Sequence, residues 1–443
     1  MESKPWWYRY RKRKYRPRNR LSLEMILRKS LVETAKEYID TCSIAGMKHI
    51  IDPNYSVFLR FFWVGSQLSC LGIVIYFLQF TWVATLTKPL VVTEDSFTFP
   101  IKDIDFPAVA LCNINRISRK ALKKVTVEMY PKLRKLNSTL TNLEYFLLNM
   151  GRLIDFDYDQ SWPQVKLIDL FDSEEYGDQV VDIMKALAPS CDEMLIKCTW
   201  AGKEVDCKSI FQVRRTILGH CCAFNYVLDY DSADKPLGTI AEIKRQIIPG
   251  SNNGLRVIAD SMLDDYAYPL TYRNGFEILI FDPTHFADIT GGRVLQRTVQ
   301  PNQAEFFQIA SIKQVASAEV RKYPLKTRKC LFRDEYSQEF TNMYSYSACI
   351  VKCRIQSVQS LCKCTPYFMP TEKLQYLYPI DTEDTEGLEQ ELADSLLCPQ
   401  CLPDCELTQH FTKSFKVPLP DELMKKRGFA NTFMSVILVD SQA

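Results

Sequence analysis

One long apolar segment dominates the hydrophobic pattern of this chain. Residues 61–87 read FFWVGSQLSCLGIVIYFLQFTWVATLT and contain no charged side chain. A helix needs about 20 such residues to cross the hydrocarbon of a bilayer, and Trp63 and Trp82 suit its two interfaces. A cleaved signal peptide would begin at the N-terminus and would be shorter. The pattern therefore predicts a transmembrane helix over residues 61–87.

Beyond this helix the pattern changes to short elements. The segments 106–112, 255–259, 276–281 and 306–315 are rich in β-branched and aromatic residues and are bounded by Gly, Pro, Asn or Asp, which is typical of strands. Helical periodicity appears over 143–153 and 334–353. We predict an α/β membrane protein with one N-terminal transmembrane helix and a large β-rich domain, to which helices and a cysteine-rich module are attached.

Charge is distributed unequally across the predicted helix. The first twenty residues contain nine Lys or Arg and one Glu, whereas acidic side chains, among them Glu94 and Asp95, follow the helix. The positive-inside rule then makes residues 1–60 cytosolic and the bulk of the chain extracellular, at the plasma membrane. Aromatic residues interleave with the basic stretch, which could indicate nucleic-acid binding. Beside a membrane helix, an anchor at anionic membrane lipid is the simpler interpretation, with no nucleic-acid partner.

Cysteine usage agrees with this topology. Eight of the sixteen cysteines fall within residues 330–405, and fourteen lie on the predicted outer side. The spacing of Cys398 and Cys401 could hold zinc in a cytosolic protein, but in an oxidising compartment it indicates disulfides. We expect neither a metal nor a cofactor. The sequon Asn137-Ser138-Thr139 predicts N-glycosylation at Asn137.

The segment from Phe106 to Arg116, FPAVALCNINR, follows the predicted helix and resembles the signature of the degenerin/epithelial sodium channel family. The residues that carry this likeness are Phe106, Pro107, Cys112 and Asn113. Further motifs follow in the family's order: SIAGMK at 43–48, GHCCAFN at 219–225, GF with DP at 275–283, and CKCTPYFMP at 362–370. The double cysteine at 221–222 and the last motif are similar to the arthropod pickpocket branch.

The resemblance covers residues 40 to about 440 and implies a domain organisation. It comprises a cytosolic segment 1–60, the helix 61–87, a palm-like and finger-like β-rich domain 88–329, a thumb-like module 330–405, and a return segment 406–443. The longest charge-free run after Cys405 is 428–439, which is too short to cross a membrane. We therefore expect no second transmembrane helix in this sequence, although the family has one.

The family pattern also implies six disulfides. Three would lie in the β-rich domain and three would form a ladder in the thumb, where they stiffen a rod that can transmit motion. The pairs are Cys112–Cys221, Cys191–Cys222, Cys198–Cys207, Cys330–Cys405, Cys349–Cys401 and Cys353–Cys398.

Two positions depart from the family pattern. The family's cytosolic gating motif is His-Gly, and here it is Ala45-Gly46, so the imidazole is lost while the glycine keeps its backbone freedom. Cys362 and Cys364 have no cysteine partner before Cys398. They are expected to be free, to bond to each other, or to pair with another chain.

By resemblance, the chain is predicted to be a subunit of a homo- or heterotrimeric amiloride-type sodium channel, ligand-gated or mechanically gated, which passes sodium ions passively. Without a second helix it should not conduct alone. The alternatives are a non-conducting regulatory subunit and an extracellular binding or adhesion module. An enzyme is not expected, because none of the four histidines lies in a nucleophile, zinc or phosphate-loop motif. Asp282, which precedes Pro283, is interpreted as a turn former.

Overall fold

The computed structural model describes residues 22–43, 46–52, 54–87, 92–133, 139–155, 180–228, 242–289, 293–335, 344–362, 366–369, 398–420 and 434–441. The chain forms two compact units, Met1–Val91 and Val92–Ala443. Ala45, Asn137 and Cys364 lie outside the described residues, as does the side chain of Cys362. The expectations for these four residues stay predictions.

The described part of the first unit contains three helices, α1 (Leu23–Thr41), α2 (Met47–Ile51) and α3 (Val57–Thr87). Among the described residues, α3 is the one helix that is long and apolar enough to cross a membrane. It begins at Val57, so the predicted start at residue 61 was too late. Arg60 does not end the helix, because its guanidinium donates to the carbonyl oxygen of Asp52 at 3.0 Å beside the first turn.

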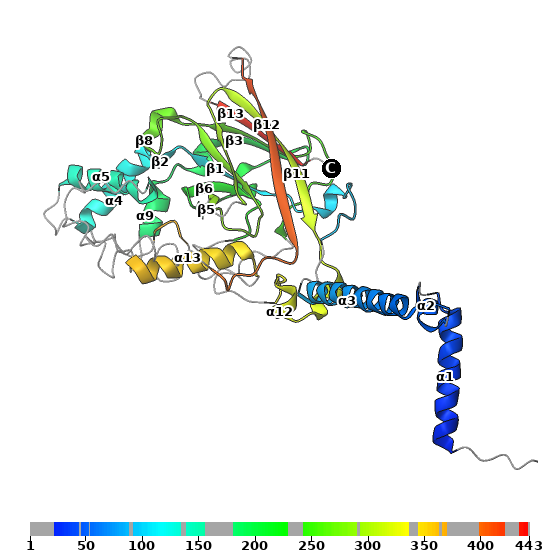
Figure 1. Cartoon of the computed structure of the whole chain (residues 1–443). Coiled ribbons are helices and arrows are strands. Elements are labelled where there is room, and N and C mark those ends of the chain that lie inside the picture. Colours follow the sequence, from blue (N-terminus) through cyan, green and yellow to red (C-terminus); the bar gives the residue numbers. More distant parts are fainter. Residues whose placement is uncertain are drawn as a thin grey trace, which may run out of the picture. The chain divides into compact units, whose positions relative to one another are not determined.

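The second unit is built on two sheets (Figure 1). One is entirely antiparallel, in the order β10 (Leu295–Val299), β9 (Phe276–Phe281), β1 (Ala108–Asn113), β6 (Gly219–Phe224) and β5 (Phe211–Thr216). The other has the order β12 (Leu407–Pro418), β11 (Gln303–Gln314), β13 (Met434–Ser441), β7 (Leu255–Asp260), β3 (Leu195–Trp200) and β4 (Lys203–Val205). A separate ladder joins β2 (Asn115–Ser118) to β8 (Tyr266–Pro269).

Strand β1 is buried on both faces. Val109 and Leu111 belong to the core between the two sheets, together with Phe307 of β11 and Ile437 of β13. The alternate residues, including Ala110, pack into a second cluster on the opposite face of the five-stranded sheet. Because successive side chains of a strand point to opposite faces, a strand buried on both sides must be apolar throughout. This accounts for the unbroken apolar run of the signature.

Helices form a separate core at one end of the second unit. This core joins α4 (Arg119–Leu133), α5 (Leu140–Asn149), α6 (Arg152–Asp155) and α9 (Val180–Leu187) to Tyr367 and Phe368. The single helix predicted over 143–153 was wrong, since α5 ends at Asn149 and α6 begins at Arg152. The break contains Gly151, where a Cβ would stand 2.4 Å from the ring of Tyr268.

Helix α13 (Tyr346–Cys362) is the long helix of the cysteine-rich module. The predicted start at residue 334 was wrong, because Asp334 and Glu335 lie in a turn and pair with Arg321 and Arg328. Cys349 and Cys353 do lie one turn apart on α13. The remaining short helical elements are η2 (Ile101–Asp103), α10 (Cys191–Met194), α11 (Cys207–Ile210), η5 (Leu263–Asp265), η7 (Ala318–Lys322) and α12 (Leu325–Arg328).

Among the described residues of the second unit there are six disulfides, and they are the six pairs that the resemblance implies. They are Cys112–Cys221, Cys191–Cys222, Cys198–Cys207, Cys330–Cys405, Cys349–Cys401 and Cys353–Cys398. The last three link the two ends of the thumb-like module to each other and to α13.

The C-terminal residues return to the middle of the six-stranded sheet. Strand β13 pairs in parallel with β11 and antiparallel with β7. The described part of the charge-free run 428–439 is therefore a strand in the core, with Ile437 and Val439 among its buried residues.

Candidate functional site

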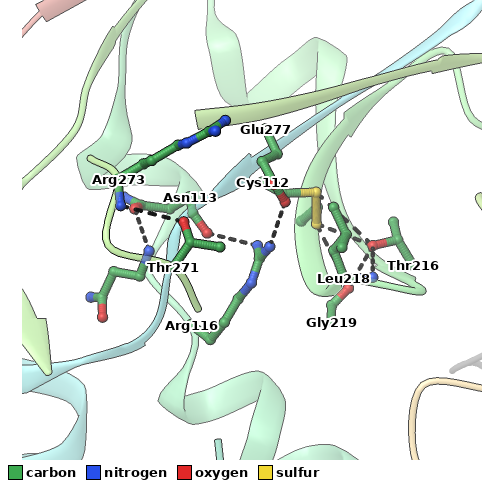
Figure 2. Close-up of polar contacts among 11 residues, drawn as sticks. Cys112, Asn113, Arg116, Thr216, Leu218, Gly219, Thr271, Arg273 and Glu277 are labelled. Atoms are coloured by element: carbon green, nitrogen blue, oxygen red, sulfur yellow. Dashed lines mark hydrogen bonds and ion pairs between the residues drawn. A yellow bond between two sulfur atoms is a disulfide. The ribbon is translucent and has the colours of Figure 1, made fainter. Parts of the chain in front are cut away.

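The polar residues that end the signature form a buried centre, shown in Figure 2. The side-chain amide of Asn113 donates to the carbonyl oxygen of Ser261 at 3.1 Å. Its oxygen accepts from the backbone N–H of Asn115 at 2.9 Å, and Arg116 donates to the carbonyl oxygen of Asn113 at 2.7 Å. These bonds turn the chain sharply at the end of β1 and direct it into β2.

Arg116 forms a buried ion pair with Glu277. The guanidinium nitrogen lies 2.9 Å from the Glu277 carboxylate, and the two side chains are 3% and 11% exposed. Glu277 stands on β9 directly opposite Cys112 of β1 (Figure 2). Burial lowers the pKa of Arg116 from its ordinary value, and the charge of Glu277 opposes this shift. The pair therefore holds the end of the signature against β9 only while both members are present.

The tail of the signature also fixes α4, the helix that follows β2. The Asn115 side-chain oxygen accepts from the backbone of Ala267 and Tyr268, at 3.1 and 3.0 Å. The Ser118 hydroxyl donates to one oxygen of Asp265, and the Lys120 backbone donates to the other at 2.8 Å. Asp265 thus caps the first turn of α4 from a distant part of the chain. Sequence reasoning missed this role of Asp265, because no local motif indicates a cap that is 145 residues away.

The adjacent cysteines of β6 serve opposite faces of the sheet. Cys221 bonds to Cys112 in the outer cluster, and Cys222 bonds to Cys191 in the core between the sheets. The hydroxyl of Thr216 lies 3.2 Å from the Cys221 sulfur beside the first bridge (Figure 2). Because neighbouring strand residues point in opposite directions, a double cysteine lets one strand carry both bridges.

The segment that leads into β1 is pinned to the sandwich. The backbone N–H of Phe106 donates to the carbonyl oxygen of Lys244 at 3.0 Å, and its ring packs edge-to-face on Trp200 at 4.8 Å. Lys313 of β11 donates to the carbonyl oxygen of Asp103 at 2.6 Å. Arg245 pairs with Asp105 at 2.7 Å. Movement of either sheet would therefore pull on the residues that follow the membrane helix in sequence.

A second polar cluster, which we call the thumb joint, connects the cysteine-rich module to the end of β9. Arg293 pairs with Asp404 at 2.9 Å, and the backbone N–H of Tyr346 at the start of α13 donates to the same carboxylate at 2.8 Å. Arg354 of α13 pairs with Asp288 in the turn after β9. Phe286 of that turn packs on Val351 and Ile355 of α13. The joint thus contains both charged and apolar contacts.

Asp282 shapes the turn at the joint, as its sequence context predicts. Its Oδ1 accepts from the backbone of Thr284 at 2.8 Å and from the Thr284 hydroxyl at 2.5 Å. Burial alone would raise the pKa of Asp282, but His285, Arg333 and the bonds from Thr284 together lower it to about 2. The carboxylate is therefore charged at neutral pH and holds the turn closed.

Two buried histidines adjoin the joint. His285 follows Asp282 in the turn. The Nδ1 atom of His410, on β12, lies 2.8 Å from the hydroxyl oxygen of Ser311. Burial lowers the pKa of His285, against the influence of Asp282 and Asp404. Burial likewise lowers the pKa of His410 to about 4, opposed by Asp282. Both imidazoles are therefore neutral at neutral pH.

Acidification is predicted to destabilise this part of the protein. A histidine with a pKa near 6.5 when unfolded and about 4 when folded takes up its proton more readily in the unfolded state. Above pH 6.5 the neutral His410 contributes its full share to the free energy of unfolding. This share is lost as the pH falls from 6.5 through about 4, and the loss is about 3 kcal/mol at most. Denaturant unfolding at a series of pH values measures this loss.

The variant His410→Gln should flatten that pH dependence, while the amide keeps a bond to Ser311. Asp282 titrates in a lower window, since its lowered pKa removes stability only as the pH falls below 3.9 toward 2. If the free energy of unfolding of His410→Gln falls between pH 6.5 and 4 as steeply as that of the wild type, His410 is not the cause of the pH dependence.

In the first unit Gly46, the described half of the Ala45-Gly46 motif, lies against the membrane helix. Gly46 has a φ of +90°, and a Cβ there would stand 2.3 Å from the Trp63 ring of α3. The ring of His49 lies 5.3 Å from Trp63 and 4.7 Å from Tyr55. Glycine is required at this position both by the backbone conformation and by the close approach of the ring.

Gly46→Ala is predicted to loosen α2 from α3 by about 1–3 kcal/mol, because it adds a strained φ to a clash. Gly65→Ala is the matched control, since a Cβ at Gly65 meets no described atom within 4 Å. Hydrogen exchange of the His49 and Asp52 amides, which bond to the carbonyls of Gly46 and Lys48, measures the effect. Faster exchange is expected in Gly46→Ala alone, and equal rates in both variants would refute the role given to this contact.

Within the described residues, no group of three or more His, Cys, Asp or Glu side chains is arranged to hold a metal ion. The two polar centres are built from ion pairs, turns and caps. Their chemistry is that of connection between the strands and the cysteine-rich module within the second unit.

Comparison with known proteins identifies the family. The sequence model of the family described as amiloride-sensitive sodium channel matches residues 38–440. Pickpocket protein 28 of Drosophila melanogaster is 22% identical over 85% of this chain and 64% of its own length. Sodium channel protein Nach of Drosophila ananassae is 23% identical over 76% of this chain and 63% of its own. Acid-sensing ion channel 1C of Danio rerio is 24% identical over 75% of this chain and 58% of its own length.

The chain thus spans less than two thirds of the length of these relatives. The family match, by contrast, includes the motif at Gly46, the helix α3, the signature strand and the whole described cysteine-rich module. The family is one of sodium channels, not of enzymes. This chain belongs to the amiloride-sensitive sodium channel family, the degenerin/epithelial sodium channels, on the pickpocket-like branch.

Proposed function

We propose that this chain is a subunit of a plasma-membrane sodium channel that assembles as a homo- or heterotrimer and passes sodium ions passively. The observation that carries the proposal is the series of contacts that links the thumb joint, β9 and the signature strand β1, together with the bond from β11 to the segment that precedes β1. Such a connection suits a protein in which movement outside the membrane must reach the membrane helices. Family membership supports the same function.

We further propose that the N-terminus is cytosolic and the second unit extracellular. The basic N-terminal stretch, the six disulfides and the sequon at Asn137 all favour this orientation. The motif at Ala45 and Gly46 would then lie on the cytosolic side, where the packing of Gly46 on Trp63 would couple the segment before α3 to the helix.

Glycosylation mapping tests the orientation, because the chain has sequons on both sides of α3, at Asn54-Tyr55-Ser56 and at Asn137. We expect the enzyme that removes N-glycans to lower the apparent mass of the wild-type chain and of Asn54→Gln, and to leave Asn137→Gln unchanged. A mass shift that persists in Asn137→Gln and disappears in Asn54→Gln would reverse the assignment.

Co-purification tests the assembly. Tagged chain is expressed with and without a full-length pickpocket relative in insect cells, and the purified complex is weighed by native mass spectrometry. We expect trimers that contain this chain. A strictly monomeric chain under both conditions would refute the subunit proposal and would favour the binding or adhesion alternative.

A further inference from the structure

Two segments of the second unit present large apolar side chains to solvent. Val92 and Phe97, in the segment that leads from the membrane helix to β1, are 79% and 92% exposed. Val315 is 62% exposed directly after β11, and Tyr323 and Leu325 are exposed in the loop that follows. We call residues 92–99 and 313–326 the collar. Apolar groups gathered in this way usually mark a contact surface.

The two parts of the collar are joined to each other. The Lys313 ammonium lies 5.1 Å from the centre of the Phe99 ring and donates to the carbonyl oxygen of Asp103 at 2.6 Å. Lys313 is the residue before the last of β11, so Val315 begins the loop beside this contact. The apolar side chains of both segments therefore belong to one end of the second unit.

The collar loop is held in a defined shape. Arg321 makes two bonds to the carboxylate of Asp334, at 2.8 and 3.0 Å, and Arg328 pairs with Glu335. These arginines also lie over the Phe332 ring, at 4.1 and 5.4 Å. Their charges are thus directed toward the protein, while the exposed Lys322 and Lys326 flank Tyr323 and Leu325. The outward surface of the loop combines lysines with apolar groups.

Chain connectivity limits how far the collar can lie from the bilayer. Helix α3 has 31 residues, about 46 Å at 1.5 Å each, which is enough to cross the hydrocarbon and both headgroup layers. Val92 is five residues beyond Thr87, the last residue of α3, and five residues span at most about 18 Å. The exposed apolar segment therefore begins within about 18 Å of the end of α3.

The charges of the collar match a zwitterionic surface. Glu94 and Asp95 stand in the first segment, whereas Lys313, Lys322 and Lys326 stand in the second together with Glu319. Lysines beside apolar and aromatic groups are typical of interfacial segments, where the stem stays apolar and the ammonium reaches a phosphate. The three carboxylates can meet the cationic part of a choline headgroup. Neither sign of charge dominates, so an anionic surface is not required.

We propose that the collar lies in the headgroup layer of the bilayer on the side of the second unit and contacts zwitterionic phospholipid there. The proposal rests on α3 crossing the membrane, as in the proposed function. It gives β11 a direct contact with the bilayer, and β11 pairs with both β12 and β13. A change in the lipid surface would then reach the six-stranded sheet without passing through α3.

Site-specific photocrosslinking tests the collar. p-Benzoylphenylalanine replaces Leu325 in the full chain, which is placed in nanodiscs of phosphatidylcholine, and phospholipid adducts are measured by mass spectrometry. The same label at Phe77 of α3 is the positive control, and at Val127 of α4, which is 62% exposed, it is the control for a solvent-facing site. We expect adducts at Leu325 about fivefold or more above those at Val127. A second label at Phe97 should behave as Leu325 does.

The controls distinguish failure of the lipid contact of the collar from failure of the proposal that α3 crosses the membrane. If phospholipid adducts form at Phe77 but those at Leu325 and Phe97 are no more abundant than those at Val127, the lipid contact of the collar is refuted. The spanning helix is then still supported. Loss of labelling at Phe77 as well would overturn the spanning helix itself. Adducts between Leu325 and a second copy of the chain, in place of lipid, would show that the collar is an interface between subunits and would overturn the lipid contact.

Discussion

Replacing Arg116 by alanine is expected to destabilise the second unit by about 3–5 kcal/mol. The substitution leaves the Glu277 carboxylate buried without its cation and removes the bond to the carbonyl oxygen of Asn113. A charge left alone in a buried site loses its hydration with no compensation. Urea unfolding of the full chain, followed by intrinsic fluorescence, measures the change against wild type.

Two further variants show whether the pairing itself is responsible. Arg116→Met with Glu277→Leu removes both charges and should be less destabilised than Arg116→Ala, because no buried charge is left. Lys124→Ala breaks an exposed pair with Glu128 and should leave the unfolding midpoint unchanged. A double variant that is less stable than Arg116→Ala would contradict the account of the buried pair.

Removing the bridge between the first strand and β6 is expected to have the second large effect. Cys112→Ala with Cys221→Ala opens a loop with a sequence separation of 109, whereas Cys198→Ala with Cys207→Ala opens one of only 9. Loop-closure entropy then gives losses of about 5 and about 3 kcal/mol respectively. The order of the two losses is the more specific prediction, because the shorter bridge is the matched control.

The same unfolding assay measures both variants under non-reducing conditions. If opening the shorter loop cost as much as opening the longer one, the stabilisation would come from local packing of the sulfur atoms and not from restriction of the unfolded chain. The role of Cys112 as the tie between the signature and a distant strand would then be refuted.

Much of the fold follows from local patterns in the sequence. The membrane helix is predicted because its apolar run is long, and β9 is predicted with its observed ends because Gly275 and Pro283 bracket an apolar segment. These features depend on residues close together in the chain.

The remaining features depend on distant residues. The break between α5 and α6 requires the ring of Tyr268 against Gly151, and the late start of α13 depends on arginines at 321 and 328. The length of the charge-free run 428–439 indicates only that it is too short to cross a membrane, whereas its described part pairs with β11 and β7. The cap of α4 by Asp265 and the thumb joint are likewise set by the order of the strands, which no local pattern reveals.

In the proposed function this chain is a sodium channel subunit whose second unit acts on the conducting pathway. The most direct measurement is whole-cell recording from cells that express a full-length pickpocket relative with and without this chain, with amiloride to isolate the channel current. We predict that co-expression changes the amplitude or gating of the amiloride-sensitive sodium current, and that the Arg116→Ala variant weakens this change. An identical current with and without the wild-type chain, when both proteins are at the cell surface, would contradict the account.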